Sequence, residues 1–275
     1  MKIINSILEV KAELQNKSCN IGFVPTMGSL HDGHISLIER AKKQNDIVVV
    51  SIFVNPTQFL EGEDLDQYPR KDESDKYICS LYGVDYLFMP DIKTIYNIDE
   101  VLVKAPRLCS YILEGEKRPG HFDGVLQIVL KLFNIIKPTN AYLGKKDAQQ
   151  LILIKQMVEN LYLEVNIISC EIIRESDGLA YSSRNVYLSK KERVQALKIS
   201  QSLKTATKCI LNNELEAASI IEKMRNELKC EEIEIEYVSI VNQKFHSIEY
   251  VENKNSIILL AVKIGTTRLI DNIWI

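Results

Sequence analysis

The chain has 275 residues, of which 46% are hydrophobic and 26% charged, a composition typical of a globular protein with one large domain or two ordinary ones. The formal net charge of −3 provides no basic surface for nucleic acid, and the apolar run at residues 47–54 is far too short to span a bilayer. We therefore expect no nucleic-acid partner and no membrane association.

The N-terminus and the cysteines indicate a cytoplasmic protein. The first six residues contain no long apolar stretch, so we expect no signal peptide. The six cysteines are scattered without a Cys-x-x-Cys pair, and we expect reduced thiols that pack as small hydrophobic residues.

Strand and helix patterns alternate through the first two thirds of the chain. Continuous β-branched runs predict buried strands, and apolar residues repeating every three or four positions predict helices. The expected strands are residues 21–24, 46–54, 86–89, 141–143 and 165–170, and the expected helices are residues 35–44, 73–81, 122–136 and 147–160, the last with Asp147 as its N-cap. This alternation predicts a parallel α/β sheet, which binds ligands beyond the carboxyl ends of its strands.

The pattern changes after about residue 174. A polar loop at 176–189 is followed by expected helices at 190–211 and 215–228, and then by expected strands at 232–241 and 256–262. Helices followed by strands predict a smaller α+β domain. We therefore expect an α/β domain at residues 1–175 and a C-terminal α+β lid domain at residues 176–275.

Two histidines lie at the start of the first helix of this α/β region. The segment 27–34, Met-Gly-Ser-Leu-His-Asp-Gly-His, follows the first expected strand and contains His31 and His34. A helix start has unpaired backbone N–H groups and a partial positive charge, so it is suited to bind phosphate, and histidines can add hydrogen bonds. A plain cap is the ordinary alternative, while a zinc site is disfavoured because zinc requires three or four ligands.

Two further segments are candidates for the same site. Asn55 and Gln58 follow the second expected strand. Their neutral amides can orient a hydroxylated acid without forming an ion pair, which would make its carboxylate a weaker nucleophile. An Asn-Pro turn is also an ordinary strand ending. The segment 118–124, Arg-Pro-Gly-His-Phe-Asp-Gly, is either a loop over the site or a helix cap, and the sequence leaves both interpretations open.

Two polar segments contain candidate phosphate ligands. Gly144 permits close backbone approach, Lys146 can meet phosphate as a point charge, and Gln150 can face the same site. The segment 174–185 contains two serines and Arg184, which suit the outer phosphates of a triphosphate. Its polar, glycine-containing composition predicts a loop that is mobile without ligand and closes over ATP, or a plain linker.

These residue types favour attack of a carboxylate on the α-phosphate of ATP. An ionised carboxylate needs no general base, so the enzyme must supply alignment and stabilise the leaving pyrophosphate. Backbone N–H groups and the side chains of His31, His34, Lys146 and Arg184 can do this. Hydrolase chemistry is disfavoured because the sequence contains no recognisable Ser-His-Asp or Cys-His pairing.

Six blocks, at residues 25–34, 51–59, 64–70, 118–124, 144–150 and 177–185, make the chain closely resemble the pantoate–β-alanine ligase (pantothenate synthetase) family. The resemblance covers about residues 20–189 and is weaker beyond. It implies a Rossmann-like, histidine-motif nucleotidyltransferase fold, similar to that of class I aminoacyl-tRNA synthetases. It also implies that (R)-pantoate and ATP give pantoyl adenylate, that β-alanine then gives pantothenate and AMP, and that the enzyme requires Mg²⁺ and is a homodimer.

The resemblance implies a role for individual residues. Pantoate is expected to bind Gln58 and Gln150, with Gln58 also bordering the β-alanine site, and His34 is expected to be the proton donor. ATP is expected to bind three groups of residues: Met27, Gly28, Ser29, Leu30, His31, Asp32, Gly33 and His34; Gly144, Lys145, Lys146 and Asp147; and Ile173, Tyr181, Ser182, Ser183 and Arg184. Metal ligands are not predicted. Lys145, Ala148 and Tyr181 depart from the family's usual residues, which affects packing around ATP rather than phosphate binding.

Two other functions are alternatives. A nucleotidyltransferase of the same superfamily would act on a phosphorylated acceptor, but such an acceptor would require Arg or Lys where this chain has Gln58 and Gln150. A non-catalytic nucleotide-binding sensor is disfavoured because both histidines, Lys146 and Arg184 are present.

Overall fold

The computed structural model describes residues 1–15 and 19–275, and these divide into two compact units. The first unit contains Met1–Gly144 and Gln149–Glu171, and the second contains Lys145–Ala148 and Ile172–Ile275. The units therefore meet in sequence at residues 171/172 rather than at the expected 175/176. The short segment Lys145–Ala148, which we expected in the first domain, groups with the second unit.

The first unit contains a parallel sheet of the kind that the alternating pattern predicted. Within the described residues the sheet has six strands in the order β1-β4-β3-β2-β5-β6, and every pairing is parallel. The strands are β1 (Lys2–Ile4), β2 (Ile21–Thr26), β3 (Ile47–Ile52), β4 (Tyr86–Phe88), β5 (Asn140–Gly144) and β6 (Asn166–Cys170). After β2 the chain first extends the sheet on one side and then returns to β2's other side with β5. This reversal makes the boundary between β2 and β5 the topological switch point of the sheet, and α/β sheets bind ligands beyond the carboxyl ends of the strands at such a point.

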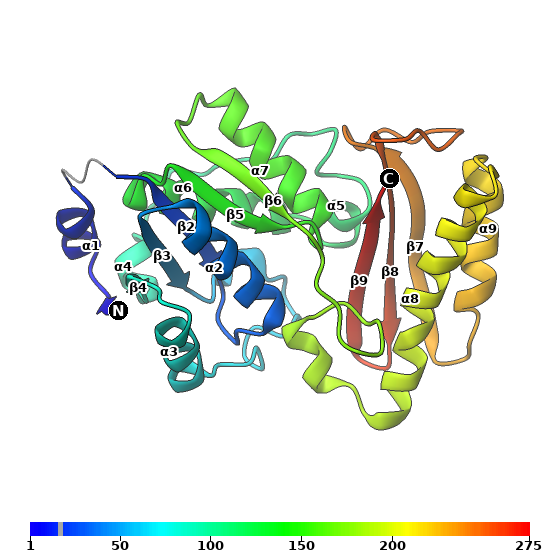
Figure 1. The fold of residues 1–275 in the computed structure, drawn as a ribbon, viewed down its shortest axis with the longest axis horizontal. Coiled ribbons are helices and arrows are strands. Elements are labelled where there is room, and N and C mark those ends of the chain that lie inside the picture. The colour runs from blue at the N-terminus through cyan, green and yellow to red at the C-terminus, as the bar shows by residue number, and fades with distance from the viewer. Residues whose placement is uncertain (16–18) are drawn as a thin grey trace. The chain divides into compact units, whose positions relative to one another are not determined.

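Helices cover both faces of this sheet, which explains why its central strands are apolar throughout. On one face, Leu37 and Ile38 of α2 pack in a cluster with Val24 and Val50; Figure 1 shows α2 lying across that face. On the other face, Phe23 meets Phe133 of α6 edge to face, with ring centroids 6.3 Å apart. The helices that begin in this unit are α1 (Ile7–Leu14), α2 (Asp32–Gln44), η1 (Pro56–Gln58), α3 (Asp72–Leu81), α4 (Ile92–Ile95), α5 (Glu114–Lys117) and α6 (His121–Ile136).

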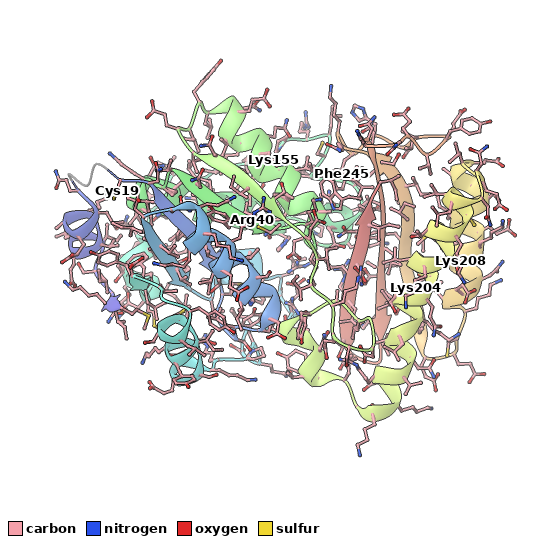
Figure 2. All side chains as sticks on the ribbon, viewed as in Figure 1. Cys19, Arg40, Lys155, Lys204, Lys208 and Phe245 are labelled. Carbon is pink, nitrogen blue, oxygen red and sulfur yellow. The ribbon has the colours of Figure 1, made fainter. Side chains whose placement is uncertain are left out.

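The helix α7 (Ala148–Asn160) follows β5, and its residues from Gln149 onward belong to the first unit. Arg40 of α2, labelled in Figure 2, donates from Nη1 to the carbonyl oxygen of Ser169 on β6 at 2.9 Å. This bond ties α2 to the last strand of the sheet.

The second unit is the α+β unit that the sequence predicted. Its described residues form an antiparallel sheet of three strands in the order β7-β8-β9, with α8 and α9 beside it (Figure 1). The elements are η2 (Ser183–Tyr187), α8 (Lys190–Leu211), α9 (Ala217–Leu228), β7 (Ile233–Asn242), β8 (Ser256–Ile264) and β9 (Thr267–Trp274). Ser189 and Glu192 form a capping box at the start of α8, which explains why this helix begins where its pattern predicted.

Seven short or terminal elements were absent from the sequence-based expectation: β1, α1, η1, α4, α5, η2 and β9. β1 has only three residues, and β9 contains Asp271 and Asn272, which belong to residue types that are rare in strands. β9 exists because Gly265, with φ 57°, turns the chain so that residues 267–274 pair with β8.

No helix in the described ranges 1–15 and 19–275 is both long and apolar enough to cross a bilayer. Within the same ranges all six cysteines are free thiols, as predicted. Burial, with a contribution from the Asp75 carboxylate, raises the pKa of the Cys79 thiol to about 12.

Candidate active site

His31 and His34 form one cluster in the turn between β2 and α2. His31 directly precedes α2, and its Nδ1 atom accepts a hydrogen bond from the Gly33 N–H at 3.2 Å. A ring nitrogen that accepts carries no proton, so the Nε2 atom of a neutral His31 carries the hydrogen and is a donor. The two imidazole centroids are 4.1 Å apart, with planes inclined at 36°. This cluster lies at the carboxyl end of β2, where the sequence placed it.

Asp75 of α3 fixes the turn that leads to His31. Gly28 and Ser29 have φ values of 84° and 52°, a conformation that glycine adopts freely but serine adopts only when its surroundings hold it. The Oδ2 atom of Asp75 accepts the Ser29 N–H at 2.7 Å, and Oδ1 accepts the Leu30 N–H at 2.8 Å. Asp75 is only 1% exposed, so its carboxylate acts on this turn from within the unit.

The backbone N–H groups of this turn are largely donated within the protein. The donated groups are Gly28 to Thr26 Oγ1, Ser29 and Leu30 to Asp75, and Gly33 to His31. Of these four residues only Gly33 lies in the first turn of α2, so our expectation of unpaired N–H groups at the helix start is wrong for Gly33, whose N–H is accepted by the His31 side chain.

Gln58 lies against the histidine turn. Its Nε2 atom donates to the Sδ atom of Met27 at 3.0 Å, and its Oε1 atom accepts from Asn55 Nδ2 at 3.1 Å. Asn55 is itself 1% exposed, and its Nδ2 atom also donates to the Gly124 carbonyl oxygen at 3.1 Å. The segments 27–34 and 51–59, which the sequence assigned to one site, are therefore in contact.

Arg118 and His121 brace the backbone of Gln58. The Nδ1 atom of His121 lies 2.7 Å from the Gln58 carbonyl oxygen, and its Nε2 atom lies 3.0 Å from Arg118 Nη1. Since Arg118 is a donor only, Nε2 accepts and Nδ1–H donates to Gln58. Arg118 also binds both carboxylate oxygens of Glu63, at 2.6 Å each. The segment 118–124, which the sequence left open between a loop and a cap, thus supports Gln58 and starts α6.

Burial, with a smaller effect of the Arg118 charge, lowers the pKa of His121 to about 4. His121 is therefore neutral at neutral pH, in agreement with its two hydrogen bonds.

The two glutamines at the start of α7 differ in environment. Gln149 is buried; its Oε1 atom accepts the Glu114 N–H at 3.1 Å, and its Nε2 atom donates to the carbonyl oxygens of Ile112, at 3.0 Å, and Cys109. Gln149 therefore anchors the segment before α5. Gln150 is half buried and belongs, like Gln58 and Gly144, to the first unit.

In the second unit, the segment Lys145–Asp147 is attached to β9. The Nδ2 atom of Asn272 donates to the carbonyl oxygens of Lys145 and Lys146, at 3.0 and 2.7 Å. The Nζ atom of Lys145 lies 5.5 Å from the ring centroid of Trp274, and the Nζ atom of Lys146 lies 3.6 Å from Asp147 Oδ1. The side chain of Lys146 is 23% exposed and thus accessible to a ligand.

The loop that contains Tyr181–Arg184 also belongs to the second unit. The Tyr181 N–H donates to the Ile173 carbonyl oxygen at 3.0 Å, and Ser182 Oγ accepts the Arg184 N–H at 3.3 Å as the cap of η2. Tyr181, Ser182, Ser183 and Arg184 are all half buried.

The first part of this loop is anchored to α8. Arg193 forms ion pairs with Glu175, at 2.8 Å, and with Asp177, at 2.6 Å. These contacts hold the start of a loop whose composition alone predicted mobility.

Sequence reasoning missed Asp75. Asp75 precedes Cys79 by four positions, so the two share one face of α3, and both are buried. A carboxylate on the buried face of a helix needs a partner, which would have been a usable signal, but the sequence could not identify the N–H groups of Ser29 and Leu30 as that partner.

A parallel α/β sheet with a histidine pair at the carboxyl end of the strand beside its reversal point defines a nucleotide-binding enzyme of the nucleotidyltransferase type. The sequence profile of the pantoate-beta-alanine ligase family matches residues 2–274. The chain belongs to this family, and the resemblance found in its six sequence blocks is confirmed.

Individual relatives agree with this assignment. The chain is 55% identical to the pantothenate synthetase of Aliarcobacter butzleri, over 100% of both chains. It matches a crystal structure of pantothenate synthetase from Thermus thermophilus with a TM-score of 0.96 at 36% identity, over 100% of this chain and 99% of that one. It matches pantoate-beta-alanine ligase from Francisella tularensis, complexed with beta-gamma ATP and beta-alanine, with a TM-score of 0.84 at 39% identity, over 100% and 97% of the two chains. The expected fold class is thereby confirmed.

Proposed function

We propose that this chain condenses (R)-pantoate with β-alanine at the expense of ATP, giving pantothenate, AMP and pyrophosphate through a pantoyl adenylate. The observation that carries the proposal, in a member of this ligase family, is the contact of Gln58 Nε2 with Met27 Sδ at 3.0 Å. This contact supports a site in which the neutral amide of Gln58, next to the histidine turn, orients the carboxylate substrate that is to be adenylated.

In the first step, a carboxylate oxygen of pantoate attacks the α-phosphorus of ATP. The new bond joins that oxygen to phosphorus, the bond to the β-phosphate oxygen breaks, and pyrophosphate leaves with the electron pair. Gln58 and Gln150 orient pantoate by hydrogen bonds that leave the attacking oxygen basic. His31, His34, Lys146 and Arg184 supply positive charge or hydrogen-bond donors for the charge that develops on the phosphates, and His34, as the proton donor, gives its proton to the oxygen of the leaving pyrophosphate.

In the second step, the neutral amine of β-alanine attacks the acyl carbon of the adenylate. A carbon–nitrogen bond forms, the bond from that carbon to the phosphate-linked oxygen breaks, the amine releases one proton to water, and AMP leaves with that oxygen. Because water competes for the same carbon, we propose that the second unit shields the adenylate as a lid.

The residues proposed to bind ATP occur in both units. In the first unit they are Met27 to His34 and Gly144; in the second they are Lys145, Lys146, Asp147, Ile173 and Tyr181 to Arg184.

We further propose Mg²⁺ as the companion of ATP, a homodimer, and a cytoplasmic location. In residues 1–15 and 19–275, no group of three or more His, Cys, Asp or Glu side chains is arranged to hold a metal. Bound together with ATP, Mg²⁺ would neutralise phosphate charge.

Oxygen labelling tests the reaction. Pantoate that carries heavy oxygen in its carboxylate should pass one labelled oxygen to AMP and none to pyrophosphate. Attack on the γ-phosphate would instead give ADP and labelled inorganic phosphate. A transferase for phosphorylated acceptors would release no pantoate-dependent AMP, and a sensor would show no turnover. Any of these outcomes would overturn the proposed adenylate route.

A further inference from the structure

A single buried amide on β9 holds two successive carbonyl groups of the Lys145–Lys146 segment. Asn272 is 2% exposed, and its Nδ2 atom donates one hydrogen to the Lys145 oxygen, at 3.0 Å, and one to the Lys146 oxygen, at 2.7 Å. A primary amide is suited to this task because it carries two hydrogens on one nitrogen. Its Oδ1 atom is buried and meets no donor within the described part of the chain, so the two carbonyl groups determine which way the amide points.

Asp271, the preceding residue, secures the other side of the same strand. Its fully buried carboxylate binds Arg174 through two hydrogen bonds, at 2.6 and 3.0 Å, and Oδ1 also accepts the Asn272 N–H at 2.8 Å. Successive side chains of a strand point to opposite faces. Leu269 and Ile273 pack in the core with α8 and α9, whereas Trp274 lies beneath Lys145, so Asp271 belongs to the core face and Asn272 to the opposite face.

This strand is a rigid base for the attached segment. β9 pairs with β8 along its whole length, with Asn272 opposite Leu259 and Asp271 opposite Leu260. Lys146 has a long, flexible side chain, and its position depends on how firmly its own backbone is held. A displacement of about 1 Å at a catalytic group can cost about a hundredfold in rate.

We infer that Asn272 is a positioning residue for adenylate formation, which acts on the leaving pyrophosphate through the backbone of Lys145 and Lys146. The inference rests on the proposed function, since it assigns Lys146 to the first step. All of these contacts lie within the second unit. Removing the amide should therefore slow the first step without affecting the attack of β-alanine on preformed adenylate, in which no pyrophosphate leaves.

The test compares Asn272→Ala with Asn242→Ala, a matched control in the same sheet. Asn242 of β7 also makes two hydrogen bonds to backbone, accepting with Oδ1 from the N–H groups of Lys244, at 2.9 Å, and His246, at 3.0 Å. Pyrophosphate release is measured at saturating ATP and pantoate, and pantothenate formation is measured in single turnover from isolated pantoyl adenylate and β-alanine. Circular dichroism establishes that each variant is folded.

We expect Asn272→Ala to lower the rate of pyrophosphate release by about 10- to 100-fold, to leave the second step within about twofold, and to differ from Asn242→Ala in the first step only. In a Lys146→Ala background, Asn272→Ala should have little further effect, because the two changes remove one function.

Several results would overturn the inference: equal loss in both steps, a first step like that of the control, or full additivity with Lys146→Ala. Asn272→Leu, which is close in size but has no hydrogen to donate and adds no charge, gives the same test if the alanine variant does not fold. The proposed function fails separately, if the wild type releases no pantoate-dependent pyrophosphate or if Lys146→Ala is fully active.

Discussion

Mild acid is expected to destabilise the first unit through His121. The folded protein needs the neutral ring, because Nδ1–H donates to Gln58 and Nε2 accepts from Arg118. Burial, together with the Arg118 charge, lowers the pKa of His121 from 6.5 to about 4. The unfolded chain therefore takes up the proton first, so the contribution to stability is complete above pH 6.5 and is lost as the pH falls toward 4.

The difference between the two pKa values lowers the free energy of unfolding by about 3 kcal/mol over the whole transition. Between pH 7.5 and pH 5.0 it lowers this free energy by about 2 kcal/mol. Glu63 does not contribute in this range. Burial opposes its ionisation, but the hydrogen bonds and charge of Arg118 prevail and lower its pKa, so its carboxylate stays charged.

Urea denaturation at both pH values measures this effect, with His121→Asn as the control. Asparagine keeps a donor near the position of Nδ1 but does not titrate. Far-UV circular dichroism follows both units, whereas fluorescence of Trp274, the only tryptophan, follows the second. The wild type should lose about 2 kcal/mol more than the variant, in the first unit only. Equal pH dependence of the two proteins would refute the reasoning. So would titration of the His121 ring near its ordinary pKa, followed by the proton resonance that is missing from the spectrum of His121→Asn.

Substitutions in the first unit give three further predictions. His34→Ala should fold normally and release pyrophosphate about a hundredfold more slowly, and a near-normal rate would remove His34 from the first step. Gln58→Ala and Gln150→Ala should raise the KM for pantoate while equilibrium binding of an ATP analogue is preserved. Weaker binding of the ATP analogue with an unchanged KM for pantoate would instead assign these glutamines to the nucleotide. Asp75→Asn should lower the free energy of unfolding by about 1–3 kcal/mol, because one oxygen cannot accept both N–H groups, whereas Asp72→Asn on the same helix should be nearly neutral in a thermal melt.

The sequence by itself was sufficient to predict the parallel sheet, the position of the histidine pair and the family. These features depend on local patterns: continuous apolar runs for strands covered on both faces, apolar repeats for helices, and chemical motifs at strand ends. α8, for example, begins and ends at the predicted residues because its cap and its apolar repeat lie within its own sequence.

Only the tertiary structure decided how the motifs are held. The Asp75 side chain accepts a hydrogen bond from the Ser29 N–H, which is 46 positions earlier in the chain. The Asn272 side chain donates one to the Lys146 carbonyl oxygen, which is 126 positions earlier. β9, which supplies Asn272, is a strand because β8 pairs with it, although Asp271 and Asn272 weaken its local signal. A hydrogen bond between distant segments leaves no periodic pattern in either one, because its partner is chosen by the path of the folded chain.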